Sequence, residues 1–256
     1  MLSVCCVVSC KTDQPAPSGF SWCFMPRDCE YLFVHNGYVK PLSEQALDYA
    51  EEHGLDTRGT YVRITETVPS DFTADKYCLT LDVTSYTPEM LKDANNDSFI
   101  FLASRDAEME DIMDEEMRRV YKSTRSSDIS DAESSAPMMY IKFIEYRKEE
   151  LKSLKITSTS TLFGLAAGTD LTGYFDVWGD ENNAFLFDWN KKFLGKLTED
   201  MSVRDYLAFR PIVSPLLILH IRETPQEVPI EAEFIVEMDL AGDKHFRAST
   251  SIELTN

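Results

Sequence analysis

The stretch EFIVEMDLAGDKHFRASTSIEL, residues 233–254, decides how the C-terminal part of the chain folds. Its first part alternates apolar and acidic side chains, with Phe234, Val236 and Met238 as the apolar positions. The alternation resumes after the turn sequence AGDK and continues to the end of the stretch. Because alternate side chains of a strand lie on opposite faces, this period of two predicts strands. The stretch therefore predicts a β-hairpin with one buried and one solvated face.

Further strands and a few helices are expected along the rest of the chain. Ser43 is placed to cap a helix that ends at Gly54, and Ser202 to cap a short helix that ends at Pro211. Segments rich in β-branched and aromatic residues predict strands at 30–34, 61–65, 77–83, 98–102, 139–146, 154–157 and 185–189. The fold class expected is α+β, mostly antiparallel β-sheet with a few short helices.

The middle of the chain changes composition sharply. Residues 106–116 are strongly acidic, yet Met109, Ile112 and Met113 keep the spacing of one helical face. This pattern is typical of an amphipathic surface helix. Residues 123–137, rich in Ser, Asp and Ala, predict a linker or mobile loop between two lobes. The expected division is a signal and tether at 1–22, an α+β lobe at 23–122, and a β-rich lobe at 138–256.

Composition and charge limit the classes of partner. The chain is 43% apolar, which is enough to bury a sizeable core. Its formal net charge is −19. Nucleic acids and anionic lipids attract basic proteins, so both are disfavoured as partners. Any membrane association is expected through a lipid anchor only.

The first ten residues, MLSVCCVVSC, look like the end of a bacterial lipoprotein signal. An apolar run without Lys or Arg ends at Cys10, and a polar, proline-containing stretch typical of a tether follows. Only nine residues precede Cys10, so the usual basic and apolar regions are curtailed. Two interpretations stay open: a true start lies upstream, or the segment is an ordinary strand start that mimics a lipobox.

Which cysteines the mature chain contains depends on which of these two interpretations holds. If Cys10 is lipidated, the mature chain keeps Cys23, Cys29 and Cys78. The short separation of Cys23 from Cys29 suits a disulfide in an oxidising compartment, whereas Cys78 is expected to be a buried apolar residue. No CxxC pair exists, and no histidine stands at zinc-ligand spacing from a cysteine, so no metal site is expected.

An aromatic cluster supplies the candidate ligand cleft. Tyr174, Trp178, Phe187 and Trp189 fall close together in the sequence and are interleaved with carboxylates and amides. Carbohydrate and peptide clefts use this combination, although core packing explains the same residues. The cleft hypothesis expects Trp178 or Trp189 to be exposed.

Other chemical motifs are weak. Asp93, Asn95 and Asp97 begin like a calcium loop, but serines stand where such a loop needs its Gly and Glu, so a polar turn is favoured. The sequence contains no GxSxG, GxxxxGK[ST] or GxGxxG motif. No cofactor is expected.

A group of sequence features forms a familiar combination. They are ITS (156–158), LFG (162–164), AGTDL (167–171), YLAF (206–209) and the terminal hairpin, together with the VVSC lipobox. Over about residues 139–256 this combination resembles uncharacterised bacterial cell-envelope lipoproteins. The resemblance implies a β-rich protein, lipid-anchored in the cell envelope at the outer membrane or the periplasm. It brings no settled activity with it.

Three classes of function follow. The first is a non-enzymatic envelope lipoprotein that binds a protein or carbohydrate at the bacterial surface, as the lipobox and the resemblance imply. The second is a cytoplasmic acidic interaction protein, such as an immunity protein or a phage structural subunit. The third is a hydrolase with an unrecognised site, which needs perturbed carboxylates gathered in one pocket. Binding is expected in preference to catalysis.

Overall fold

The computed structural model describes most of the chain, and the fold is α+β and rich in antiparallel strands, as predicted. The described residues are 20–41, 43–52, 60–64, 72–87, 89, 106–113, 115, 140–179, 185–197 and 199–255. The chain divides into two compact units. Unit 1 comprises Met1–Arg27 and Ala94–Tyr146, and unit 2 comprises Asp28–Asp93 and Arg147–Asn256.

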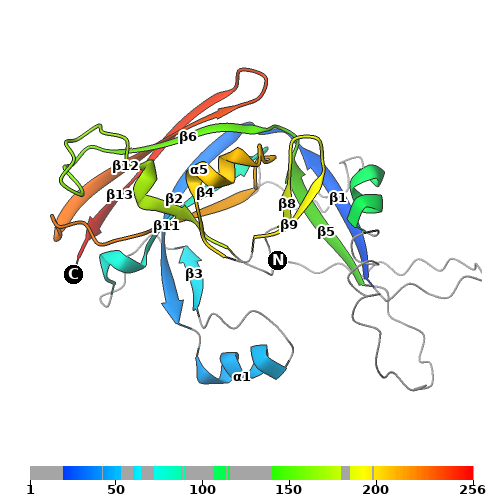
Figure 1. Cartoon of the computed structure of the whole chain (residues 1–256), viewed down its shortest axis with the longest axis horizontal. Helices are drawn as coiled ribbons and strands as arrows, with labels where there is room; N and C mark the ends of the chain where they lie inside the picture. Colours follow the sequence, from blue (N-terminus) through cyan, green and yellow to red (C-terminus); the bar gives the residue numbers. More distant parts are fainter. Residues whose placement is uncertain are drawn as a thin grey trace, which may run out of the picture. The chain divides into compact units, whose positions relative to one another are not determined.

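The larger sheet of unit 2 has six strands in the order β10-β7-β11-β4-β2-β3 (Figure 1). Its strands are β2 (Tyr31–Pro41), β3 (Thr60–Ile64), β4 (Tyr77–Thr84), β7 (Phe175–Val177), β10 (Met201–Ser202) and β11 (Leu216–Ile221). β4 pairs antiparallel with β2 on one side and with β11 on the other. Strands from both ends of the sequence therefore share one sheet.

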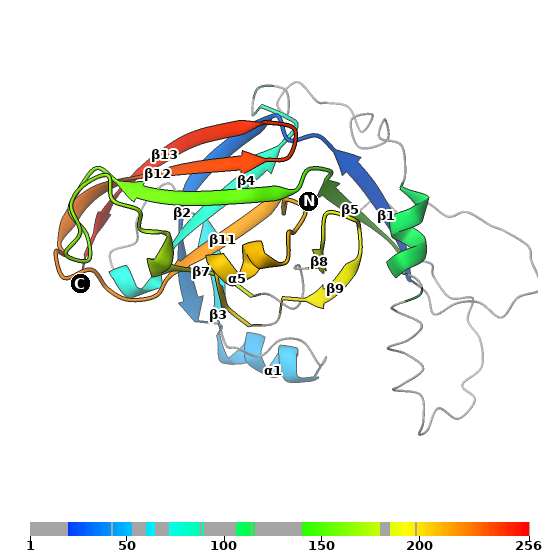
Figure 2. The ribbon, with the colours of Figure 1, turned by 45° about the horizontal axis from the view of Figure 1, so that its top comes forward.

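The second sheet has the order β13-β12-β6 and contains the predicted hairpin (Figure 2). β12 (Ile230–Leu240) pairs with β13 (His245–Leu254) on one side and with β6 (Leu151–Ser158) on the other. Phe234, Val236 and Met238 are buried, and Glu231 and Asp239 are exposed. The alternation in the sequence thus predicted both the hairpin and its buried face correctly.

The core of unit 2 lies between these two sheets. Phe234 of β12 is fully buried; its ring stacks on Tyr77 of β4 at 5.3 Å and meets Phe175 of β7 edge to face at 5.8 Å. Alternate residues of β4 and β11, such as Leu79 and Leu219, belong to the same buried cluster. Burial of apolar surface across the two facing layers is the main stabilising term for such an arrangement.

Short helices and turns connect the strands. α1 (Glu44–Glu52) begins after Ser43, whose hydroxyl accepts the Ala46 N–H at 3.2 Å, and α5 (Val203–Ala208) begins after Ser202, which accepts the Asp205 N–H at 3.1 Å. Both predicted N-caps are confirmed. The remaining elements are the 3-10 turns η1 (Ala74–Lys76) and η2 (Thr172–Tyr174) and the hairpin of β8 (Phe185–Phe187) with β9 (Phe193–Lys196). No helix among the described residues is both long and apolar enough to cross a membrane.

The edge of β6 that does not pair with β12 is covered by the segment that follows β6 in the sequence. The Ile156 N–H donates to the Thr172 hydroxyl at 2.9 Å, and the Ile156 carbonyl accepts the Leu171 N–H at 2.7 Å. Further along, the Gly168 N–H donates to the Ser158 carbonyl at 2.8 Å. Gly168 has a φ of +80°, a conformation that side chains disfavour, and this lets the loop turn back onto the strand. These bonds satisfy backbone groups that an edge strand otherwise exposes.

Unit 1 contains a pair of strands and an amphipathic helix. β1 (Phe20–Arg27) pairs with β5 (Tyr140–Arg147). Residues 107–113 are helical, and the Asp106 carboxylate caps them by accepting the N–H of Met109 at 3.2 Å. Met109 and Met113 are buried, as the helical spacing predicted, and Phe24 is buried against the edge of the Tyr146 ring.

The division into units differs from the lobes expected at 23–122 and 138–256. β2 and β4 come from the expected N-terminal lobe, but they share a sheet with β7 and β11. Residues 28–93 therefore join residues 147–256 in one unit. The predicted linker at 123–137 and the predicted strand at 98–102 lie outside the described residues.

Phe234→Ala tests the importance of the inter-sheet packing. We expect it to lower the free energy of unfolding by about 3–5 kcal/mol, because it removes a fully buried ring that contacts both Tyr77 and Phe175. Urea unfolding followed by circular dichroism measures the change. The control Ser251→Ala alters an exposed side chain of β13 and should change stability by no more than about 0.5 kcal/mol. Equal effects of the two substitutions would contradict the proposed role of Phe234.

Candidate functional site

The four residues of the predicted cleft occupy different environments. Phe187 is buried in the protein interior. Tyr174 stacks on Phe163 with ring centroids 4.0 Å apart, and Trp178 is half-buried with its ring edge to face against His220. Trp189 alone of the four is strongly exposed, at 46%. The expectation of an exposed tryptophan is met at this residue.

A tight turn between β8 and β9 presents Trp189. The Asp188 carboxylate accepts the N–H groups of Asn190 at 2.8 Å and Lys192 at 2.9 Å, a bonding pattern by which aspartate stabilises turns. Lys191 has a φ of +62°, which is unusual for a residue with a side chain. The Trp189 N–H donates to the Arg210 carbonyl at 2.9 Å. The turn is therefore tied to the chain that follows α5, and Figures 1 and 2 show the β8–β9 hairpin beside α5.

Arg210 forms the second part of this site. Its guanidinium lies 4.6 Å from the centroid of the Trp189 ring, within the range of a cation–π interaction. Its Nε and Nη2 donate to the two carboxylate oxygens of Glu150 at 2.7 and 3.1 Å. These hydrogen bonds with Glu150 raise the pKa of Arg210. The Glu150 side chain is only 10% exposed, so this bidentate pair fixes the guanidinium from the protein side.

Phe209 extends the apolar part of the site. It directly precedes Arg210 and is 42% exposed. Arg210 itself has a φ of +52°. A residue with a side chain in this conformation is strained and is held there by its surroundings. We refer to Trp189, Phe209 and Arg210 together as the Trp189 surface. Exposed tryptophan and arginine side chains are the residue types that contribute most to protein-binding hot spots.

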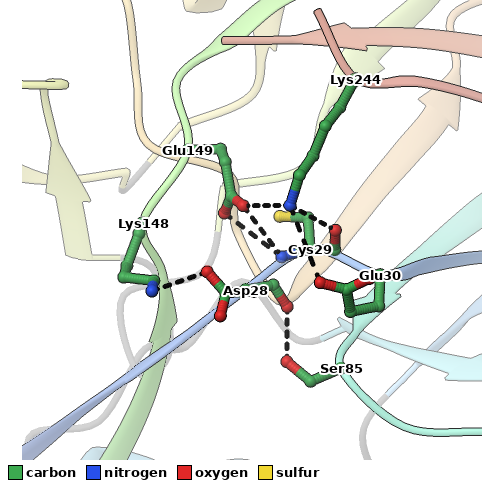
Figure 3. A network of polar contacts seen from close by, with 7 residues as sticks. All are labelled: Asp28, Cys29, Glu30, Ser85, Lys148, Glu149 and Lys244. Atoms are coloured by element: carbon green, nitrogen blue, oxygen red, sulfur yellow. Dashed lines mark hydrogen bonds and ion pairs between the residues drawn. The ribbon is translucent and has the colours of Figure 1, made fainter. Parts of the chain in front are cut away.

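A polar network joins the start of β2 to the β12–β13 turn. Glu149 accepts the Cys29 N–H with both carboxylate oxygens, each at 3.2 Å. Lys244 donates to Glu149 at 2.7 Å and to the Cys29 carbonyl at 3.0 Å. Figure 3 shows the Glu149 and Lys244 side chains meeting at the backbone of Cys29. The network fixes the position of this backbone.

The charges and burial of this network shift the pKa values of its members. Burial would raise the pKa of Glu149, but the hydrogen bonds from Lys244 and Cys29 outweigh it and hold that pKa below its usual range. Burial, reinforced by the nearby Glu149 charge, raises the pKa of the Cys29 thiol strongly. Because the thiolate is the reactive form of cysteine, the protonated Cys29 is a poor nucleophile.

The predicted Cys23–Cys29 disulfide stays a prediction. Cys23 is buried in β1 of unit 1, and Cys29 is buried in unit 2. Cys78, expected as a buried apolar residue, is fully buried in β4, and burial raises the pKa of its thiol strongly.

Three residues that lie side by side on neighbouring strands are of the types found in the active site of a cysteine hydrolase. Cys78, His220 and Asp176 are register partners on β4, β11 and β7. The thiol is fully buried and protonated, however, and His220 places Nε2 3.1 Å from the Asp75 carbonyl. Asp176 forms an ion pair with Arg222 at 3.3 Å. The row therefore lacks an accessible thiolate and an aligned base, both of which nucleophilic catalysis requires.

A second group contains the types found in a serine hydrolase. Asp239 lies between Ser153 and His245, accepting the serine hydroxyl at 2.6 Å and contacting His245 Nδ1 at 2.7 Å. In a catalytic triad the histidine lies between serine and carboxylate, because it takes the serine proton. Here the carboxylate is in the middle, so the group does not activate Ser153.

One described groove is polar and acidic. It has a volume of about 530 Å³ and is lined by residues of β12, β13 and the loop after β6. Glu231 and Glu253 lie directly opposite one another there, and both are exposed. The described residues contain no group of three or more His, Cys, Asp or Glu side chains placed to hold a metal ion.

Several predictions stay untested. Cys10 and the calcium candidates Asp93, Asn95 and Asp97 lie outside the described residues. Comparisons with protein families, with curated proteins and with solved structures find no match to this chain. The resemblance to envelope lipoproteins is therefore still a prediction.

Sequence reasoning identified Trp189 but missed the residues that hold it. Glu150 and Arg210 are separated by 60 residues, and nothing in either local sequence indicates that they pair. Phe209 was noted only as part of the segment before Pro211. A local signal for Arg210 was absent, because its conformation depends on contacts from distant strands.

Glu149→Gln tests the network around Cys29. At pH 7 we expect it to lower the free energy of unfolding by about 1 to 2 kcal/mol, because Lys244 loses its carboxylate partner. Since folding lowers the pKa of Glu149, its contribution is fully present above the unfolded pKa and is lost as the pH falls through the folded pKa. The stability difference should begin to shrink below the ordinary glutamate pKa of about 4.3 and disappear only below the lowered folded-state pKa of Glu149.

Urea titrations from pH 7 to acid measure this convergence. Glu223→Gln, at an exposed position, is the matched control and should show no comparable loss at pH 7. A stability difference for Glu149→Gln that is the same at every pH would contradict the proposed electrostatic role.

Proposed function

We propose that this chain is a non-enzymatic cell-envelope lipoprotein that binds a protein partner through the Trp189 surface. The observation that carries the proposal is the exposure of Trp189, at 46%, over a guanidinium fixed by Glu150. A fixed aromatic side chain loses little conformational entropy when a partner covers it.

A protein partner is favoured over a carbohydrate by the shape of the site. Trp189 lies on a turn between two strands, and Phe209 lies at the C-terminal end of α5. One described groove, on β12 and β13, contains none of these residues. Projecting anchors of this kind are typical of protein interfaces, whereas small ligands prefer concave pockets.

The anchor is supported by the N-terminal sequence. Cys10 ends an apolar run and precedes a proline-containing stretch typical of a tether. The net charge of −19 disfavours direct docking on anionic lipid, so lipid on Cys10 would supply the membrane attachment. A tethered protein of this kind acts by holding its partner near the membrane.

Mass spectrometry of the N-terminus tests the anchor. In the native cell we expect the mature chain to begin at Cys10 with a diacylglyceryl group on its sulfur, and Cys10→Ala to leave the protein unprocessed and unlipidated. A mature chain that retains residues 1–9 without lipid would contradict the anchor and favour the cytoplasmic alternative.

Photo-crosslinking from position 189 tests the surface. A photoreactive phenylalanine analogue at Trp189 should give a discrete crosslinked protein in intact cells, since the side chain is exposed at the proposed interface. The same analogue at the exposed Lys152 of β6 is the control and should not give that product. Identical products from both positions, or none from position 189, would contradict the proposal.

A further inference from the structure

Arg210 has hydrogen-bond donors that none of the described residues uses. Nε and Nη2 are occupied by Glu150, and the arginine side chain is 56% exposed. Nη1 donates no hydrogen bond to any of the described residues. A guanidinium carries five N–H donors in a plane, so its outer edge is available to an acceptor outside the protein.

The guanidinium is oriented before any ligand arrives. Glu150 fixes its inner edge, and the Trp189 ring lies against its face at 4.6 Å. The backbone of Arg210 is held at a φ of +52°, and that of Lys191 at +62°. Both values lie in the left-handed region, so the backbone of the two adjoining turns is held in a sparsely populated conformation. A fixed fork of donors favours a planar acceptor such as a carboxylate.

Hydrogen-bonding geometry, and not net charge, selects the ligand at this site. Glu150 pairs with Arg210 and the Asp188 charge also acts on the guanidinium, while the exposed Lys192 adds a positive charge beside the turn. A ligand carboxylate is therefore held by charge-assisted hydrogen bonds from the remaining donors of a fixed guanidinium.

We infer that the Trp189 surface recognises an acidic peptide segment of the partner. A side-chain carboxylate accepts hydrogen bonds from Arg210 Nη1, and a neighbouring apolar side chain of the same segment packs on Trp189 and Phe209. The inference rests on the proposed function and adds the chemistry of the partner. Trp189 lies against the Arg210 guanidinium and Phe209 precedes Arg210 in the sequence, so acidic and apolar residues must be close together in the segment.

Selection from a library of displayed heptapeptides tests the inference. On the wild-type protein we expect enrichment of sequences in which Asp or Glu lies beside an aromatic or aliphatic residue. Arg210→Lys keeps a positive charge for Glu150 but removes the planar outer edge, so it should lose this enrichment. Arg204→Ala removes a charge at a side chain that is 91% exposed, and it should retain the enrichment. Enriched peptides without carboxylates, or no enrichment, would overturn the inference.

A synthetic peptide of the most enriched sequence gives the quantitative test. Replacing its Asp or Glu by the matching amide should weaken binding by about tenfold or more, and so should Arg210→Lys in the protein. Thermal melting of Arg210→Lys within a few degrees of wild type shows that the fold is intact. Equal affinity for the acid and the amide would overturn the inference.

A competition experiment with an acidic carbohydrate distinguishes a peptide carboxylate from a sugar carboxylate. Oligogalacturonate carries carboxylates without peptide, and we expect it to compete poorly with the selected peptide. Competition at equal strength would overturn the peptide assignment. A crosslink from position 189 combined with failure of the acid–amide comparison would keep the protein partner and reject the acidic segment. Absence of the crosslink would reject the proposed function itself.

Discussion

The packing of Phe234 between two sheets is the constraint on which unit 2 depends. Its ring contacts Tyr77 from β4 and Phe175 from β7, two strands of the opposite sheet. A single buried side chain thus links segments from the beginning, middle and end of the described chain. Because protein interiors are closely packed, the spacing of the sheets depends on this ring. The positions of the turns and loops that connect the strands depend in turn on that spacing.

The Trp189 surface is connected to the strands of unit 2 at several points. Glu150 directly precedes β6, and its backbone forms an isolated bridge with Ile212. Asp188 forms a similar bridge with Pro211. The carboxylate that fixes Arg210 and the turn that presents Trp189 are therefore both held by backbone hydrogen bonds to one segment. A rigid base of this kind lets exposed side chains keep a single arrangement without being buried.

Local patterns in the sequence predicted the elements, and distant contacts decided how they combine. The alternation around Phe234 and the serines before α1 and α5 act within a few residues, so they were visible in the sequence. β4 pairs with β11, and the paired residues are more than a hundred positions apart in the sequence. Nothing in the sequence of either strand indicates that the other is its neighbour. The lobes expected at 23–122 and 138–256 differed from the units for this reason. Trp189 was visible as an aromatic residue, but its contact with Arg210, which Glu150 holds, was not.

The covered edge of β6 has a consequence for contacts between copies of the chain. An open strand edge offers unpaired backbone groups to the same edge of a neighbour, and such pairing starts aggregation. The Thr172 hydroxyl and the Leu171 N–H occupy the backbone groups of Ile156 at that edge. A second copy that meets β6 at this point therefore finds these groups already bonded.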